Sequence, residues 1–402
     1  MNQPPAPSAR LGVAAIGIVS PLGVGRPAVA AALLAGSRAG LIADAVRVPG
    51  KTLRVGALPG DLPSLAPAFA ADACRNNQAM AAALRQIEED VARVAAHYGR
   101  HRIAVVLGSS TGGIAEGEAA YDVVRRTGAW PDSFRYRQQE VGGLANFAAR
   151  FLGLTGPAYA VATACSSSGK AFASARRLIM LGVCDAAVVG GADTLCGMTA
   201  NGFSALEAVS PGFCNPFSRN RDGINIGEAA AAFLLTREEA EINLLGMGES
   251  SDAHHVSAPD PSGQGAFEAM RLALADAGLT AADIGYVNLH GTATPLNDVM
   301  EGKAVHRLFG SATPCSSTKS MTGHALGAAS ACEAAFLWLT LHPGHNDGRL
   351  PPHLWDGAQD PAIPSLNLVA GGMRVPAGKR AMLSNSFAFG GSNFALILGQ
   401  GG

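Results

Sequence analysis

One cysteine of this chain stands where a nucleophile would be placed. Cys165 ends the apolar run 159–163 and precedes a segment of helical composition that extends to Leu181. This order predicts a strand, a sharp turn and a helix, with the thiol at the turn. Unpaired N–H groups and the helix dipole favour thiolate at a helix N-terminus, so we expect a lowered pKa for Cys165. The alternative is a structural cysteine buried as a small apolar residue.

Two histidines and one lysine stand near glycines at the ends of expected elements. His290 follows the apolar run 284–289, His324 follows Gly323, and Lys319 lies five residues before His324. Parallel α/β sheets place their binding groups at strand ends and in the loops that follow, so these side chains are candidates for one cleft. A structural role for the histidines and a solvated position for the lysine are the alternatives.

This combination of side chains fits acyl transfer through a thioester. A thiolate attacks the thioester carbonyl, and neutral imidazoles donate hydrogen bonds to an oxygen that gains negative charge. A cysteine hydrolase needs one imidazole as a base and a third group to orient it. Two histidines with a lysine fit the stabilisation of an enolate better.

Strands alternate with helices along the chain, which predicts a layered α/β fold with mostly parallel sheets. The expected strands are 13–18, 103–107, 159–163, 186–189, 231–235, 284–289, 381–384 and 394–398. The expected helices are 78–98, 166–181, 265–277, 299–308 and 327–341.

The chain divides into two similar halves. A strand leading into a reactive side chain and then a small-residue helix occurs at Cys165, and a similar order occurs at His324. The charged stretch 236–241 separates two apolar segments. We therefore expect an N-terminal half, 1–240, that carries the nucleophile and a C-terminal half, 241–402, that carries the histidines and the lysine.

Composition excludes several classes of protein. The 402 residues are 48% hydrophobic with a formal net charge of -1, and no basic run is interleaved with aromatics, which argues against nucleic-acid binding. Seven cysteines without a CxxC pair argue against a disulfide framework or zinc cluster and indicate a reducing, cytoplasmic location. The apolar stretch 11–24 is too short to span a membrane. The adjacent His254 and His255 would point to opposite faces of an extended segment, so we expect no metal site.

Four separated motifs resemble those of the β-ketoacyl-[acyl carrier protein] synthases of types I and II, condensing enzymes of the thiolase-like superfamily. The resemblance covers nearly the whole chain. The motifs are Thr163-Ala164-Cys165-Ser166-Ser167, Leu289-His290-Gly291-Thr292-Ala293-Thr294-Pro295, Ser317-Thr318-Lys319-Ser320-Met321-Thr322-Gly323-His324 and Asn385-Ser386-Phe387-Ala388-Phe389-Gly390-Gly391-Ser392-Asn393.

The resemblance implies a thiolase-like fold of two duplicated α/β halves, with stacked mixed sheets and helices in layers, in a homodimer or a heterodimer. As a 3-oxoacyl-[acyl carrier protein] synthase, the chain would load an acyl group onto Cys165 and condense it with malonyl carrier protein. His290 and His324 would stabilise the enolate formed when carbon dioxide leaves, and Lys319 would set their electrostatics. No cofactor beyond the carrier protein's phosphopantetheine arm is implied.

The resemblance also implies roles for neighbouring residues. The backbone N–H groups of Cys165 and Phe389 would form the oxyanion hole, and Phe389 would act as a gate. Thr292 and Thr294 would contact the phosphopantetheine arm. The remaining implied residues are Phe387 and Thr111 in the substrate pocket, Glu301 as a structural carboxylate near Lys319, and Asp252 as a second structural carboxylate.

Two departures from the family pattern bear on the substrate. Thr111 stands where type II enzymes carry a bulky aliphatic side chain, and Ala388 replaces a glycine beside Phe389. A smaller, more polar Thr111 would admit a longer, polyunsaturated or aromatic-tipped chain, whereas the methyl group of Ala388 would restrict the gate loop. This favours aryl-polyene or polyketide-like synthesis over bulk fatty-acid elongation. Arg75 and Arg219 are candidate contacts of the carrier protein.

Two alternatives to this function are considered. A thiolase-type acyltransferase needs a second cysteine in the C-terminal glycine loop, and 385–393 contains none. A non-catalytic chain-length-factor subunit typically lacks the nucleophile, which is present here as Cys165.

Overall fold

Ten strands form two groups of five with the same connectivity. The computed structural model describes residues 10–401. Across the first group the order is β6 (Ala158–Val161), β5 (Ile103–Gly108), β7 (Ala186–Asp193), β9 (Ala229–Thr236) and β1 (Leu11–Ser20). Across the second the order is β12 (Pro314–Ser316), β11 (Ile284–Asn288), β14 (Ala381–Phe387), β15 (Ser392–Gln400) and β10 (Ile242–Ser251).

The directions of the strands match as well as their order. In each group the first three strands are mutually parallel and the last two pairings are antiparallel. Strands β1 and β10 pair antiparallel, with Leu11 opposite Leu244, and so join the two groups, called the first and the second sheet below, into one 12-stranded sheet. The short β13 (Asn367–Leu368) extends the second group beyond β12. The same topology therefore occurs twice along the chain.

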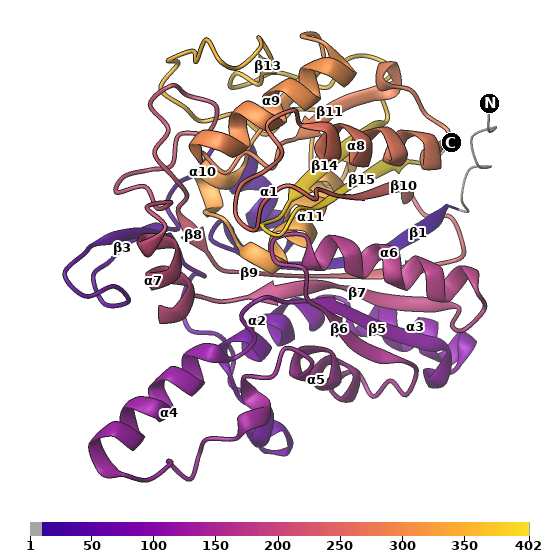
Figure 1. Cartoon of the computed structure of the whole chain (residues 1–402). Coiled ribbons are helices and arrows are strands. Elements are labelled where there is room, and N and C mark those ends of the chain that lie inside the picture. The colour runs from indigo at the N-terminus through magenta and orange to yellow at the C-terminus, as the bar shows by residue number, and fades with distance from the viewer. Residues whose placement is uncertain (1–9, 402) are drawn as a thin grey trace.

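Helices cover both faces of each sheet, and two of them lie between the sheets (Figure 1). The central pair is α6 (Ser167–Met180) and α11 (Ala329–Leu341), and every residue of α11 is buried. The outer helices are α2 (Arg75–Leu84), α3 (Glu88–Tyr98) and α5 (Gly143–Phe151) on the first sheet, with α8 (Gln264–Ala277) and α9 (Pro295–Phe309) on the second. Apolar side chains of α6, α11 and both sheets share one core cluster, which fixes the two sheets relative to each other.

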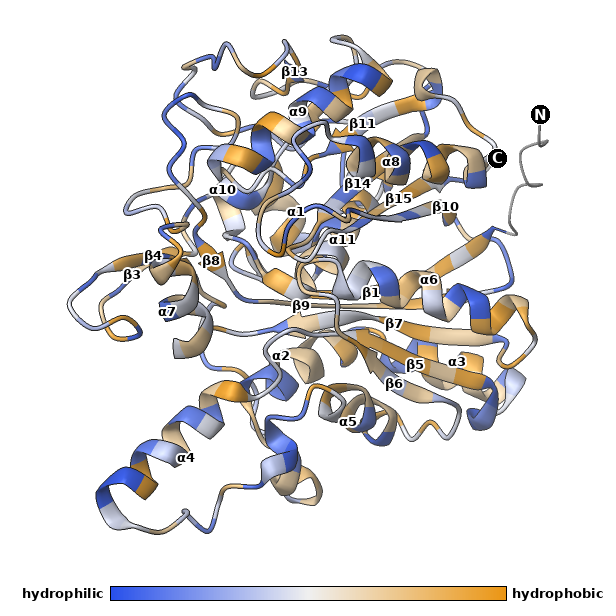
Figure 2. Ribbon diagram, in the orientation of Figure 1, coloured by the Kyte–Doolittle hydropathy of each residue, from blue (hydrophilic) through white to orange (hydrophobic). Residues whose placement is uncertain are grey.

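Smaller elements complete the fold. They are α1 (Arg26–Leu34), α4 (Ile114–Thr127), α7 (Gly197–Ala205), α10 (Lys319–Thr322), the pair β2 (Gly23–Val24) with β1, and a small sheet of β3 (Leu41–Asp44), β4 (Leu53–Gly56) and β8 (Ile226–Gly227). Helix α4 projects from the body of the molecule (Figure 1). Apolar residues dominate β5 and β7, whereas α4 alternates polar and apolar residues (Figure 2). Within the described part of the chain, none of the helices has the length and hydropathy to cross a membrane.

All eight strands expected from sequence are present. The three-residue β12 was missed, and so was the ten-residue β10. The glycines of β10 argued against a strand in the sequence analysis, because glycine is uncommon in strands. A Cβ on Gly246 would lie 2.4 Å from the Ala273 carbonyl oxygen, and one on Gly248 would lie 1.9 Å from that of Ala269. These glycines therefore let helix α8 pack directly onto the backbone of β10.

The expected helix 78–98 is two helices. Helix α2 ends at Leu84 and α3 begins at Glu88, with Ile87 fully buried between them. The Gln86 side chain accepts a hydrogen bond from the Ile18 N–H at 3.1 Å and donates to the Ile18 carbonyl at 3.0 Å. The helix is interrupted at this turn because the two hydrogen bonds of Gln86 tie the turn to the backbone of β1 and because Ile87 packs in the core.

Candidate active site

Cys165 lies at the turn between β6 and α6, as predicted. Helix α6 begins at Ser167, and the Ser167 hydroxyl accepts a hydrogen bond from the Thr163 N–H at 2.9 Å. The preceding residue, Ala164, has a φ of 51°. A left-handed backbone at a non-glycine residue costs about 1–3 kcal/mol and persists only where the surrounding structure enforces it. The fold therefore holds the thiol in a fixed, strained turn.

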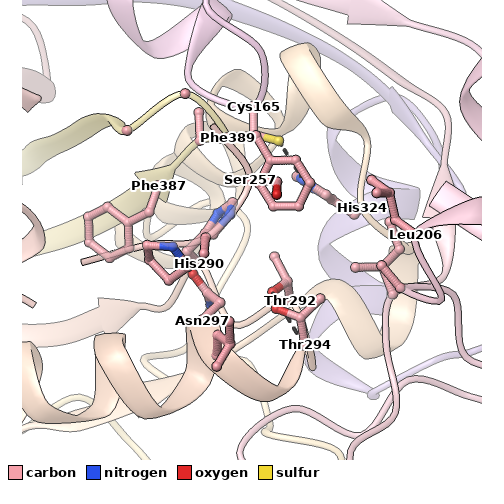
Figure 3. A pocket seen from close by; sticks show the side chains of 18 of the residues that line it. Cys165, Leu206, Ser257, His290, Thr292, Thr294, Asn297, His324, Phe387 and Phe389 are labelled. Carbon is pink, nitrogen blue, oxygen red and sulfur yellow. Dashed lines mark hydrogen bonds between the residues drawn. The ribbon is translucent and has the colours of Figure 1, made fainter. Parts of the chain in front are cut away.

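The three reactive side chains predicted from sequence meet in one place. The Sγ atom of Cys165 lies 3.0 Å from Nε2 of His324. The rings of His290 and His324 have centroids 5.3 Å apart and are nearly perpendicular. All three side chains line the same cavity (Figure 3). The cluster combines a nucleophile from the first half with two imidazoles from the second.

Strained residues also flank both histidines. Ala293, three residues after His290, has a φ of 63°, and Leu326, two residues after His324, has a φ of 47°. The His324 N–H donates to the Asn225 carbonyl at 2.6 Å, and the His324 carbonyl accepts from the Gly227 N–H at 2.9 Å, which ties its loop to the short strand β8. Each imidazole is thus placed by a turn that the chain would not adopt on its own.

A buried carboxylate holds the turn at His290. Glu301 on α9 accepts hydrogen bonds from the N–H groups of His290 and Gly291, both at 2.7 Å. The Asn385 amide donates to the same carboxylate at 3.2 Å. Burial raises the pKa of Glu301 to about 7. Its contacts differ from the predicted ones, since it supports the His290 backbone and forms no described ion pair with Lys319.

The carboxylate paired with Lys319 is Glu333. Lys319 begins α10 and is buried, and its ammonium forms an ion pair with Glu333 on the buried helix α11. Burial raises the pKa of Glu333 to about 7, although the positive charge of Lys319 lowers it. The acid that pairs with Lys319 therefore lies on the central helix, and Glu301, expected as a structural carboxylate near Lys319, supports the turn of His290 instead of forming this ion pair.

Both catalytic-site imidazoles are neutral. Burial lowers the pKa of His290 and of His324 well below the usual value, and the positive charge of Lys319 lowers both further. Neither ring has a hydrogen-bond partner at Nδ1 among residues 10–401. Because Nδ1 is unpartnered, neither ring is locked into one tautomer. Each imidazole can therefore offer Nε2 either as an acceptor or as a donor.

Cys165 rests as a thiol in the empty site. Burial raises the pKa of Cys165 to about 12, whereas Lys319 and the backbone N–H groups of Phe389 and Cys165 lower it. The expected lowering of this pKa by the helix N-terminus is wrong for the empty site, because desolvation of the thiolate outweighs it. An oxyanion hole needs two N–H donors at the acyl oxygen beside the sulfur, and the N–H groups of Phe389 and Cys165 lie close enough to the thiol to act on its pKa.

A cavity of about 370 Å³ leads to these side chains. Thr292 and Thr294 line it, with their hydroxyls 2.9 Å apart (Figure 3). Its apolar wall includes Phe203, Leu206, Ile224, Phe387 and Phe389. Such a channel, apolar with two hydroxyls, suits a long flexible ligand that carries a few polar groups.

Phe389 lies between this cavity and the surface. Its side chain is 39% exposed, and its ring centroid lies 5.9 Å from that of Phe203 on α7. The turn that follows it uses Gly390 and Gly391, with φ values of 84° and 78°. Both residues with a left-handed backbone in this turn are therefore glycines. The backbone of Ala388 is not left-handed, so its position does not require a glycine.

Asp252 braces the loop that carries Phe389. Its carboxylate accepts a hydrogen bond from the Asn393 amide at 2.8 Å, and its N–H donates to the Gly391 carbonyl at 2.7 Å. Asp252 also lines the cavity. Its contacts agree with the structural role expected for it.

Thr111 does not line the open cavity, so its expected position at the pocket is not observed. The residue is fully buried, and its hydroxyl donates to Asp193 at 2.7 Å. The argument that Thr111 makes the pocket more polar is therefore wrong, because its hydroxyl is already engaged.

The two arginines considered for carrier docking differ in their surroundings. The Arg75 guanidinium donates two hydrogen bonds of 2.7 Å to the buried Glu228, so its charge is already paired. Arg219 is exposed, and no ion pair involves it among the described residues.

Three residues of the site were not singled out from sequence. They are Glu333, Asp193 and Asn225. Glu333 had a readable signal, since a single acidic residue in the otherwise apolar helix Ala329–Leu341 must be paired when it is buried. Asp193 and Asn225 act through contacts with distant loops, and no local pattern marks them.

Two family models match residues 10–354 of this chain. Residues 10–241 match the "Beta-ketoacyl synthase, N-terminal domain" and residues 241–354 match the "Beta-ketoacyl synthase, C-terminal domain". The chain belongs to the β-ketoacyl synthase family. The family resemblance predicted from the four motifs is confirmed, and so is the thiolase-like α/β fold.

Curated relatives of this synthase are 3-oxoacyl-[acyl-carrier-protein] synthases. The protein of that name from Rhizobium meliloti (strain 1021) is 41% identical over 268 residues, which are 61% of each chain. The one from Staphylococcus aureus is 34% identical over 314 residues, 74% of this chain and 76% of that protein. These similarities confirm the predicted enzyme class.

A solved structure resembles this synthase over almost its full length. It is a chain of the complex of the ketosynthase ApeO with its chain length factor ApeC from Xenorhabdus doucetiae. The sequences are 45% identical, the TM-score is 0.92, and the alignment covers 98% of both chains.

Proposed function

We propose that this synthase catalyses a decarboxylative Claisen condensation between an acyl group on Cys165 and malonyl carrier protein, releasing 3-ketoacyl carrier protein and carbon dioxide. The observation that carries the proposal is the 3.0 Å contact of the Cys165 thiol with a neutral His324, beside a second neutral imidazole, His290. Family membership and the names of the curated relatives support the same reaction.

The first step loads the acyl chain. The Cys165 sulfur attacks the acyl thioester of the carrier protein while its proton passes to Nε2 of His324. The carbonyl oxygen becomes an oxyanion, which the N–H groups of Cys165 and Phe389 stabilise. The bond from the carbonyl carbon to the carrier sulfur then breaks, and that sulfur takes the proton from His324. The products are acyl-Cys165 and the free carrier thiol.

The second step forms the carbon–carbon bond. The malonyl carboxylate leaves as carbon dioxide, and its bonding electron pair becomes an enolate whose oxygen accepts hydrogen bonds from Nε2–H of His290 and His324. The enolate carbon attacks the acyl-Cys165 carbonyl, and the carbon–sulfur bond of Cys165 breaks. The released Cys165 thiolate then takes up one proton from solvent, which regenerates the thiol. Neutral histidines suit this step, because the enolate needs N–H donors and gains nothing from a full proton transfer. Lys319 keeps them neutral by lowering their pKa.

The carrier protein supplies the only prosthetic group in this proposal. Its phosphopantetheine arm would enter the cavity past Thr292 and Thr294, whose hydroxyls can meet the amides of the arm. The apolar wall at Phe203 and Leu206 would pack against its methylene groups. We place this reaction in the cytoplasm, where seven unpaired cysteines would stay reduced.

The proposal divides the chain into two cooperating halves and includes a second subunit. Half 1–240 would supply Cys165 and half 241–402 the two histidines with Lys319. The exposed edge of β6 and the exposed aromatic residues Tyr121, Trp130 and Tyr136 on and beside α4 support a dimer. The partner would be a second copy or a chain length factor, as in the complex of the similar ketosynthase.

The acyl chain that we propose is longer or more unsaturated than those of bulk fatty-acid synthesis, as in aryl-polyene or polyketide-like pathways. The 45% identity to a ketosynthase that forms a complex with a chain length factor supports the proposal. Condensation rates with saturated and polyenoyl carrier thioesters test it. A clear preference for saturated medium chains would contradict it.

A reconstituted condensation tests the reaction itself. The purified protein is mixed with acyl carrier protein and malonyl carrier protein, and 3-ketoacyl carrier protein and carbon dioxide are measured in equal amounts. If no product forms alone, the assay is repeated with a candidate chain length factor. Failure under both conditions would favour the alternative of a non-catalytic partner subunit. Release of free acetyl-CoA-type thioesters without decarboxylation would favour a thiolase-type acyltransferase.

A further inference from the structure

The buried carboxylate of Asp193 binds one loop through three hydroxyl groups. Asp193 ends β7 and is completely buried. It accepts hydrogen bonds from the hydroxyls of Ser109, Ser110 and Thr111 at 2.7, 2.6 and 2.7 Å. The N–H groups of Ser110 and Thr111 add further bonds of 2.9 Å. Five donors thus surround one side chain.

No cation pairs with Asp193 among residues 10–401. A buried carboxylate without a cation is costly, and at Asp193 five hydrogen-bond donors of one loop offset that cost. The carboxylate also lies close enough to Cys165 for its charge to act on the thiol.

The loop bound by Asp193 connects the two sides of the active site. On one side it approaches helix α6, since a Cβ on Gly108 would lie 2.2 Å from the Ser168 nitrogen. On the other side the Ser110 hydroxyl accepts a hydrogen bond from the Gly327 N–H at 3.2 Å, three residues after His324. A Cβ on Gly327 would lie 2.7 Å from the Asp193 carboxylate. The end of β5 that leads into the loop therefore packs on the first turn of α6, three residues after Cys165, and the loop itself contacts the turn of His324.

Asp193 and Lys319 act on Cys165 with opposite sign. Lys319 lowers the pKa of the thiol and Asp193 raises it. The other titratable groups that face this thiol are His324, at 3.0 Å, and His290, both neutral. Glu333 lies behind Lys319 and pairs with it. Among the described carboxylates, Asp193 is thus the one whose effect on the pKa of Cys165 is opposite to that of Lys319.

We propose that Asp193 is a positioning residue that holds the Cys165 and His324 turns in register through the Ser109–Thr111 loop and keeps Cys165 a thiol until a thioester enters. A resting thiol resists oxidation and alkylation, because the thiolate is the reactive form. His324 then removes the proton only when an acyl carbonyl stands ready for attack. The inference deepens the proposed function, since it takes Cys165 as the acyl acceptor.

The test is the pH dependence of Cys165 alkylation by iodoacetamide in the absence of any substrate, read by mass spectrometry of the peptide that carries Cys165. In Asp193→Asn we expect the apparent pKa of alkylation to fall. A fall of one unit raises the thiolate fraction, and hence the rate at pH 7.5, about tenfold. The matched control is Asp185→Asn, which neutralises an acid at the other end of β7. It should leave the profile unchanged.

Ser110→Ala separates the structural part of the proposal from the electrostatic part. This variant keeps the charge of Asp193 but removes the hydroxyl that reaches Gly327. We expect an unchanged alkylation pKa and a slower acyl transfer from acyl carrier protein to Cys165, by about tenfold. An unchanged alkylation profile in folded Asp193→Asn would overturn the proposal. If that variant does not fold, wild-type acyl transfer in Ser110→Ala overturns it instead. Because alkylation needs no substrate, loss of the proposed condensation activity would leave this readout intact.

Discussion

The Sγ atom of Cys165 and the Nε2 atom of His324 lie 3.0 Å apart, although 159 positions separate these residues along the chain. The thiol comes from the turn before α6 and the imidazole from the turn between α10 and α11. This contact gives the buried thiol a base at hydrogen-bond distance, which a thiol with a pKa of about 12 needs in order to react near neutral pH.

Replacement of the nucleophile should separate the two half-reactions. Cys165→Ala cannot accept an acyl chain, so condensation should fall by at least about a thousandfold. Decarboxylation of malonyl carrier protein should continue, because His290, His324 and Lys319 remain. Mass spectrometry of the acyl-enzyme and release of labelled carbon dioxide measure the two outcomes. Cys184→Ala, which alters a buried cysteine outside the cavity, should behave like the wild type; an acyl-enzyme in Cys165→Ala would refute the assignment.

The two histidines should be distinguishable by which step they support. His290→Ala removes one donor to the enolate, so decarboxylation should fall by about a hundredfold to a thousandfold while acyl loading stays within a factor of about ten. His324→Ala should slow both steps, because it also removes the base at the thiol. Single-turnover acyl transfer and carbon dioxide release are measured separately, with His306→Ala on α9 as the control. Equal effects of His290→Ala on both steps would contradict this division.

Removal of Lys319 should change the pH dependence of decarboxylation. The positive charge of Lys319 lowers the pKa of both histidines, so in Lys319→Met these values rise. A histidine with a higher pKa becomes protonated at a higher pH, and an imidazolium at rest would bind the malonyl carboxylate in the wrong place. The acid limb of decarboxylation should therefore move to higher pH, measured in the Cys165→Ala background. Lys303→Met, at an exposed position of α9, should leave the limb in place.

Stability should depend on pH through Glu301. Its pKa is about 7 in the folded protein against 4.5 for the free group, so the folded state holds a proton that the unfolded state has lost between these values. This contribution is complete below pH 4.5 and is lost as the pH rises through 7, which amounts to about 3 kcal/mol. The free energy of unfolding of the wild type minus that of Glu301→Gln should fall by this amount between pH 4.5 and 7.5, measured by urea denaturation. A pH-independent difference would show that Glu301 is ionised in the folded state.

The reactive side chains could be predicted from sequence because they stand at the ends of strands or beside glycines. Cys165, His290 and His324 each occupy such a position, and a thiol with two imidazoles has few chemical uses. The residues that support these side chains were harder to predict from sequence. Glu301 was expected near Lys319, and Glu333, the acid that pairs with Lys319, was not singled out. Which acid meets Lys319 depends on how α9 and α11 pack and not on a spacing in the sequence.

Errors in the fold arose where tertiary packing overrides local preference. Strand β10 contains Gly246 and Gly248, which argue against a strand until helix α8 is placed on them. The position of Thr111 was expected from the family pattern, but the direction of its hydroxyl depends on Asp193, which lies 82 positions further along the chain. Long-range contacts of this kind leave no trace in a local pattern.

The repeated strand order places two residues with different chemistry at equivalent points of the chain. In each half the third strand, β6 or β12, leads through a loop to a central helix, α6 or α11. The loop of the first half holds Cys165 and that of the second half holds His324. Two identical copies would have put the same residue at both points, either two thiols or two imidazoles, and neither pair contains both an acyl acceptor and its base. The pairing of an acyl acceptor with its base at this site therefore depends on a difference between two otherwise similar halves.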